Sequence, residues 1–172
     1  MRKIHQVFLI CFLNLNFGFA QSKSEIDYLL NEIAETKDSK EITETIQALE
    51  IIAYGGKVLP ILTEFFIDST PTSVKSECQN RNLTKGEIAI ILADKVERMP
   101  YALLMGVRNC LLEFCENNPN LIEYYLPWIN RDGALNFKVK YINWLSKDWI
   151  KRAKGEKRRE RKKIIREWKI NQ

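Results

Sequence analysis

Histidine is almost missing from this chain, since His5 is the only one in 172 residues. It lies in an N-terminal segment that we predict to be removed on export. Imidazole has the side-chain pKa nearest neutrality, so it dominates general base catalysis, nucleophile activation and transition-metal ligation. A mature chain without histidine therefore lacks the usual means for most of these activities.

Catalytic motifs are missing as well. The chain has no GxSxG nucleophile motif, and Gly55-Gly56 is not followed by the Lys-Ser/Thr pair of a phosphate-binding loop. The cysteines include no CxxC pair, so they offer no structural zinc set. We therefore expect a non-enzymatic protein without a cofactor or a metal.

Carboxylates remain as the only general acid or base candidates in quantity. Glu87, Asp94 and Glu97 fall in one predicted helix, and the first two share a face because they are seven residues apart. A hydrolase of envelope polysaccharide could use such a pair, which is the enzymatic alternative. Two helical turns separate them by roughly 10 Å, and Glu87 is expected to cap the helix. A solvated helix face is the favoured interpretation.

The N-terminus has the order of features of a signal peptide. Arg2 and Lys3 precede an apolar segment, Val7 to Leu13, that is too short to span a bilayer. Small residues, Gly18 and Ala20, then stand at positions −3 and −1 of a cleavage site. We predict that residues 1–20 are cleaved and that the protein is exported, to the periplasm or outside the cell.

Charge divides the remaining chain into two parts. Residues 21–150 form an acidic helical domain with a net charge of −5, whereas residues 151–172 form a basic tail. From Lys151 to Lys169 eleven Lys or Arg residues stand against Glu156, Glu160 and Glu167, a net charge of +8. The tail is predicted to be a long helix that either docks on the acidic body or stays free.

The tail could also bind an anionic envelope surface by Coulomb attraction, through side chains such as Lys157, Arg158 and Arg159. Nucleic acid is disfavoured as a partner because export removes the usual target. Envelope binding through the tail is thus the second alternative.

Helical periodicity dominates the body, and no strand pattern stands out. The expected helices cover residues 24–36, 42–53, 57–67, 84–99, 100–115 and 121–128. The fourth begins with Thr84-Lys85-Gly86-Glu87, which has the form of a capping box. Asp68 to Asn82 is expected to be the one long loop. The predicted fold is all-α, as a compact irregular helical bundle.

The second helix is marked by apolar residues at helical spacing, Ile42, Ile46, Leu49, Ile52 and Ala53. One face of the fifth holds Tyr101, Leu104, Met105, Arg108, Leu111, Leu112 and Cys115. Arg108 is unusual on such a face, so it is a candidate for binding.

Two segments share an arrangement. Leu49 to Phe66 and Leu111 to Ile129 each contain a helix, a stop of glycine or asparagine, and an apolar helix with a Leu-Pro pair. Here the chain resembles HEAT-like helical hairpin proteins, over about half of its mature length. Such repeats stack helix pairs and present a concave protein-binding face. The resemblance implies a short stack of helical hairpins and partner binding rather than catalysis.

Three cysteines, Cys78, Cys110 and Cys115, remain after export. The last two are five apart on a predicted helix, so they point about 140° apart and are not expected to bridge each other. Cys78 with either of them is a possible disulfide. Three buried free thiols are the other possibility.

The sequence therefore predicts a helical protein that acts by binding another protein, for example as an inhibitor or immunity protein. Its candidate contacts are the 68–82 loop and the surface near Tyr101, Arg108, Tyr124 and Tyr125. The partner itself is not identified.

Overall fold

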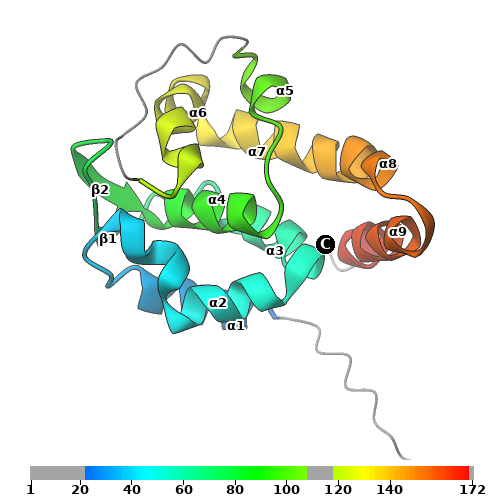
Figure 1. The fold of residues 1–172 in the computed structure, drawn as a ribbon, viewed down its shortest axis with the longest axis horizontal. Helices are drawn as coiled ribbons and strands as arrows, with labels where there is room; N and C mark the ends of the chain where they lie inside the picture. The colour runs from blue at the N-terminus through cyan, green and yellow to red at the C-terminus, as the bar shows by residue number, and fades with distance from the viewer. Residues whose placement is uncertain (1–21, 108–117, 171–172) are drawn as a thin grey trace, which may run out of the picture.

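The structure is a computed structural model that describes residues 22–107 and 118–170 (Figure 1). Helices dominate, and the described residues also hold one two-stranded antiparallel sheet. The order is α1 (Lys23–Ile33), η1 (Ser39–Glu44), α2 (Ile46–Ala53), η2 (Gly55–Lys57), α3 (Leu59–Phe65), β1 (Pro71–Ser76), β2 (Arg81–Thr84), α4 (Lys85–Val96), α5 (Tyr101–Met105), η3 (Leu121–Tyr125), α6 (Leu126–Asp132), α7 (Ala134–Trp144), η4 (Leu145–Trp149), α8 (Ile150–Arg152) and α9 (Gly155–Ile170).

Helix α4 is the central element. In Figure 1 it lies between α1 to α3 on one side and α5 to α7 on the other. Residues 88–93 are all buried, because this stretch is apolar on every side of the helix. Gly86 allows its first turn to approach α3, since a Cβ there would lie 2.8 Å from the carbonyl oxygens of Phe66 and Asp68.

The predicted capping box at the start of α4 is confirmed. The Thr84 hydroxyl accepts a hydrogen bond from the Glu87 amide at 3.3 Å, and the Glu87 carboxylate accepts one from the Thr84 amide at 2.9 Å. Each side chain satisfies one amide that has no partner within the helix.

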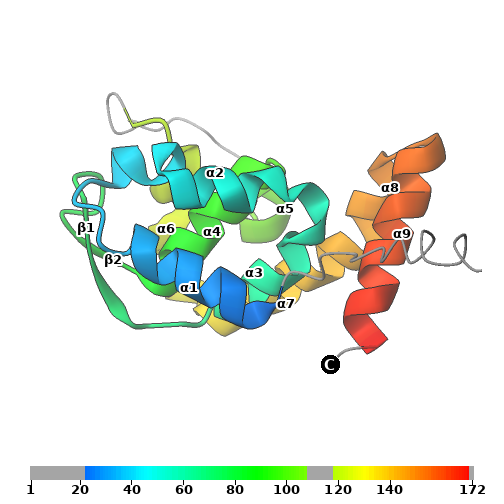
Figure 2. The same cartoon turned by 90° about the horizontal axis from the view of Figure 1, so that it is seen from below.

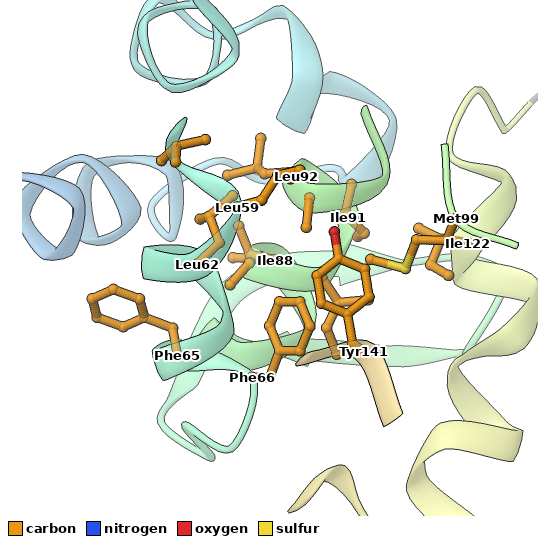
Figure 3. Packing of buried hydrophobic residues seen from close by; sticks show 14 of the residues in the cluster. Leu59, Leu62, Phe65, Phe66, Ile88, Ile91, Leu92, Met99, Ile122 and Tyr141 are labelled. Atoms are coloured by element: carbon orange, nitrogen blue, oxygen red, sulfur yellow. The ribbon is translucent and has the colours of Figure 1, made fainter. Parts of the chain in front are cut away.

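The hydrophobic core gathers around α4 (Figure 3). Leu59 and Leu62 approach it from α3, Phe66 from the residue that caps the end of α3, and Tyr141 from α7. The rings of Phe66 and Tyr141 are 5.2 Å apart, which joins the two sides of the body. One continuous cluster of buried side chains therefore positions all the surface elements described below.

The helix predicted over residues 42–53 begins only at Ile46, and most of the apolar residues that marked it are not its buried residues. Ala48 and Ile51 are the buried residues of α2, whereas Ile46 and Leu49 are 79% and 54% exposed. The reason is that residues 39–44 form a 3-10 helix and a new helix begins after Thr45, whose hydroxyl accepts from the Ala48 amide at 3.1 Å. The two stretches therefore do not share one helical periodicity.

The predicted 68–82 loop is also wrong, because most of it forms the β1–β2 hairpin. Thr72, Val74 and Ser76 alternate inward along β1, and Leu83 is buried from β2. The strands pair Lys75 with Asn82 and Ser76 with Arg81. The all-α prediction therefore holds for most of the chain and fails at this hairpin.

The helix predicted over residues 100–115 ends early. Helix α5 stops at Met105, and Gly106 takes the left-handed conformation with φ 68°. Glycine adopts this conformation without a steric penalty, so it commonly terminates helices. Arg108, Cys110 and Cys115 lie outside the described residues.

The apolar helix predicted over residues 121–128 is built in two parts. Its first residues form the 3-10 helix η3, and α6 begins at Leu126 with Pro127 in its first turn. Proline lacks a backbone N–H, but in the first turn of a helix that N–H would have no partner within the helix, so its absence costs nothing there. This explains where the α-helix begins.

The C-terminal part of the chain folds back on itself. Helix α7 continues through the π-helical turn η4 into α8, and the chain then changes direction at Ala153, which is extended, and Gly155, which has φ 56°. Figure 2 shows α9 lying across the end of the molecule, beside α8. The predicted charged helix is present but is interrupted at residues 153–154.

Among the described residues no helix is both long and apolar enough to cross a membrane. Residues 1–20 lie outside the described range, so the signal peptide and export stay predictions.

Candidate functional site

Helix α9 is anchored to the body by one buried cation. Arg161 is only 4% exposed, and its Nη2 donates hydrogen bonds to both carboxylate oxygens of Glu97 at 2.9 Å. Its Nη1 donates to the Trp149 carbonyl oxygen at 2.6 Å, and the guanidinium lies 4.3 Å from the centre of the Trp149 ring. The basic tail therefore docks on the acidic body rather than standing free.

Apolar contacts complete this docking. Ile164 and Ile165 are buried on the same side of α9 as Arg161, and Trp149 is fully buried beneath them. Trp149 packs so closely on Gly56 that a Cβ there would lie 2.8 Å from its ring. The side of α9 that carries Arg161, Ile164 and Ile165 is therefore buried against the body and is not available to a partner.

The outer face of α9 and its approach carry the remaining cations. Of the eleven Lys and Arg residues from Lys151 to Lys169, Arg161 is buried and the other ten are exposed. The predicted binding residues Lys157, Arg158 and Arg159 are among them. Sixteen helical residues extend over about 24 Å, so these cations form a long exposed basic strip, which we call the α9 outer face. Lys157 and Arg158 lie four and three residues before Arg161, so they are on its side of the helix and are exposed one turn before it.

The three tyrosines predicted as contacts come together. The rings of Tyr101 and Tyr125 stack with centroids 4.4 Å apart, and Tyr124 meets Tyr125 edge-on at 5.2 Å. Trp128 extends the group, 5.1 Å from Tyr124. Tyr125 is buried and the others are half-buried, so the group mainly joins α5 to η3 and α6.

Tyr101 is further tied to Asp94. Its hydroxyl donates to Asp94 Oδ2 at 2.6 Å, and the Met99 amide donates to Oδ1 at 2.7 Å. Burial, and then the hydrogen bond to Asp94, raise the pKa of Tyr101. Burial also raises the pKa of Asp94, against the hydrogen bonds that lower it. Both groups of this pair are occupied within the fold.

Glu87, the other carboxylate considered for catalysis, is equally engaged. Arg81 donates two hydrogen bonds to it at 2.8 and 2.5 Å, and Asn130 Nδ2 donates a third at 2.9 Å. Burial alone would raise the pKa of Glu87, but the bonds from Arg81, Asn130 and Thr84 outweigh it and lower the pKa. Glu87 therefore joins the hairpin and α6 to α4.

This arrangement predicts a pH-dependent contribution to stability. Because the pKa of Glu87 is lower in the folded protein than in the unfolded chain, its carboxylate stabilises the fold above pH 4.5, and this is lost as the pH falls through the folded-state pKa. Glu87→Gln is expected to cost about 1 kcal/mol at pH 7. In urea titrations the difference from the parent protein should shrink below pH 4.5; an equal difference at every pH would contradict this role.

Sequence reasoning missed a buried polar cluster around Glu123. This residue is fully buried, and its carboxyl group accepts from Ser39 Oγ at 3.0 Å, Ser76 Oγ at 2.5 Å and Asn120 Nδ2 at 3.2 Å. Its backbone carbonyl oxygen accepts from Gln79 Nε2 at 2.6 Å. The cluster joins η1, the hairpin and η3. No local pattern could reveal it, because the hydroxyl donors are 84 and 47 residues away in sequence.

Cys78 lies in the turn of the hairpin and is disulfide-bonded. Both of its expected partners, Cys110 and Cys115, fall outside the described residues. The pairing of Cys78 with one of them therefore stays a prediction.

Comparison with known proteins gives no match: no family model, no curated protein and no solved structure is similar to this chain. The resemblance to HEAT-like helical hairpin proteins stays a prediction.

Proposed function

We propose that this chain is an exported, non-enzymatic binding protein that takes an acidic protein partner on the α9 outer face. The observation that carries the proposal is that one cation of the tail is buried against the body while the others are exposed. Arg161 is used to dock the helix, and the other cations are exposed on a helix whose position is fixed. Because the backbone of this helix is already ordered, only the side chains lose conformational freedom on binding, which favours a specific acidic surface.

An anionic envelope surface is the second candidate. A basic helix that lies in a membrane interface needs an apolar face toward the acyl chains. In α9 Ile164 and Ile165 are buried against the body and Trp168 is half-buried, whereas Ile170, near the C-terminal end of the helix, is 75% exposed. One exposed apolar side chain does not make an apolar face, so envelope binding would rely mainly on charge, which makes the protein partner the preferred proposal.

The two carboxylates considered for catalysis are held by hydrogen bonds within the fold, which supports a binding role over hydrolysis. Glu87 is held by Arg81 and Asn130, and Asp94 by Tyr101 and Met99. These bonds account for both groups as parts of the fold. An inhibitor or immunity role falls within the proposal.

The test compares two variants with the same change in charge. One carries Lys157→Glu, Arg158→Glu and Arg159→Glu on the α9 outer face, and the other carries Lys37→Glu, Lys75→Glu and Lys95→Glu at exposed sites elsewhere. Proteins captured from envelope extract are identified for both variants and for the parent protein. We expect an acidic protein that the parent and the second variant capture and the first variant loses.

Two results would overturn the proposal. Equal loss in both variants would mean that net charge alone, and not the α9 outer face, governs capture. Binding only to vesicles that contain anionic lipid, with no protein captured selectively, would assign the function to the envelope surface instead.

A further inference from the structure

Helix α2 carries apolar side chains on two opposite sides. Its inner side places Ala48 and Ile51 in the core. Its outer side presents Ile46, which is 79% exposed, Leu49, which is 54% exposed, and the exposed Ala53. These positions are i, i+3 and i+7, so they lie along one face of the helix. We call this set the α2 stripe.

The α2 stripe is held in place at both ends of the helix. Thr45 caps the first turn through its bond from the Ala48 amide at 3.1 Å. At the other end, the Tyr54 hydroxyl is 2.7 Å from Glu25 on α1 and 3.1 Å from Glu50 on α2. With two buried residues facing the core, α2 cannot turn the stripe inward without breaking these contacts.

Acidic side chains flank the α2 stripe in sequence. Glu41, Glu44 and Glu50 are exposed on η1 and α2. Lys40, six residues before Ile46, is paired with Glu77 at 2.6 Å, whereas Lys57, four residues after Ala53, is exposed. From Ser22 to Ala53 the chain has eight carboxylates and three lysines. The apolar stripe therefore sits in a surface of negative charge.

The negative charge around the α2 stripe decides which kind of partner can bind there. A second copy that docked through the same stripe would bring its own glutamates against these, and like charges at an interface are unfavourable. A partner with cations around an apolar groove would instead satisfy both the stripe and its surroundings. Recognition of a helix in a groove uses anchors at the spacing seen here.

We propose that α2 is a second interaction surface, which inserts the α2 stripe into an apolar groove of a protein partner whose rim is basic. This surface differs from the α9 outer face, since the two helices do not overlap in either view (Figures 1 and 2), although η2, which follows α2, packs against α9 at Gly56 and Ile164. The inference goes beyond the proposed function and does not depend on it.

The experiment replaces Ile46 by a photo-reactive amino acid in the full chain and expresses this chain in the organism that naturally makes it. The proteins that become covalently linked to position 46 on illumination are then identified. The matched control places the same amino acid at Val139, an exposed apolar residue on α7. We expect one protein adduct from position 46 that position 139 does not give. Adding Leu49→Asp, or Glu41→Lys with Glu44→Lys, should abolish the adduct.

All the changed side chains are exposed, so we expect every variant to fold. Thermal unfolding followed by circular dichroism checks this. Charge reversal at residues 157–159 should leave the adduct unchanged, which separates this surface from the α9 outer face. An adduct at twice the mass of the chain would replace the proposed partner with a second copy. The same protein from both positions, no adduct, or an adduct insensitive to Leu49→Asp would overturn the proposal.

Discussion

Replacing Arg161 by alanine is expected to lower the free energy of unfolding by about 3 kcal/mol and to release α9 from the body. The substitution removes two charge-assisted bonds to Glu97, one bond to the Trp149 carbonyl oxygen and the contact with the Trp149 ring. Glu97 is partly exposed and can be rehydrated, so the cost should lie at the lower end of the range for breaking a buried pair.

Urea denaturation measures this change, and limited trypsin digestion locates it. Cleavage at residues 151–159 should become faster in Arg161→Ala, because the released helix gives the protease access. The matched control is Arg158→Ala, an exposed cation on the same helix, which should change the stability by less than about 0.5 kcal/mol. Equal stability and equal cleavage in the two variants would contradict the anchoring role of Arg161.

Glu123→Ala is expected to destabilise the protein by about 3 kcal/mol. It leaves the hydroxyls of Ser39 and Ser76 and the amide of Asn120 without this acceptor inside the fold, and it opens a cavity where the side chain was. Glu123→Gln should cost less, since it keeps the volume and one acceptor oxygen, and the hydroxyls can rotate to accept from its amide.

The control for this cluster is Glu77→Ala in the adjacent turn. Glu77 is mostly exposed and forms an ion pair with the partly exposed Lys40, so its loss should cost less than about 1 kcal/mol. Urea titrations of the three variants give the comparison. If Glu123→Ala were no more destabilising than Glu77→Ala, the cluster would not hold η1, the hairpin and η3 together as described.

Local signals in the sequence predicted what local interactions determine. The capping box at Thr84 and Glu87 placed the start of α4 correctly, because both bonds form within one turn. The glycine stop after α2 is confirmed by Gly55, which has φ 59°. Pro60 lies in the first turn of α3 as expected.

Other features were missed because distant contacts decide them. The alternation of Thr72, Val74 and Ser76 is the strand signal in residues 68–82, but it is short and two of its three inward residues are polar. The helix predicted over residues 42–53 begins only at Ile46, because a 3-10 helix precedes it and changes the phase of the buried residues.

The candidate site shows the same division between local and distant causes. Charge composition predicted a basic helix, and its cations Lys157, Arg158 and Arg159 are exposed. The sequence could not single out Arg161 among eleven cations, because its burial depends on Glu97, 64 residues earlier. The contacts among Tyr101, Tyr124 and Tyr125 likewise need α5 and η3 to meet in the fold.

The central claim is that the α9 outer face binds an acidic protein by charge. The most direct measurement is the affinity of the captured partner, purified, for the parent protein and for the variant reversed at residues 157–159, each over a series of salt concentrations. Salt screens exposed charges, so the parent protein should bind progressively more weakly as salt rises. The account predicts that the variant binds at least about tenfold more weakly at low salt, a difference of about 1.4 kcal/mol, and responds less to salt. Equal affinity and equal salt dependence in the two proteins would contradict it.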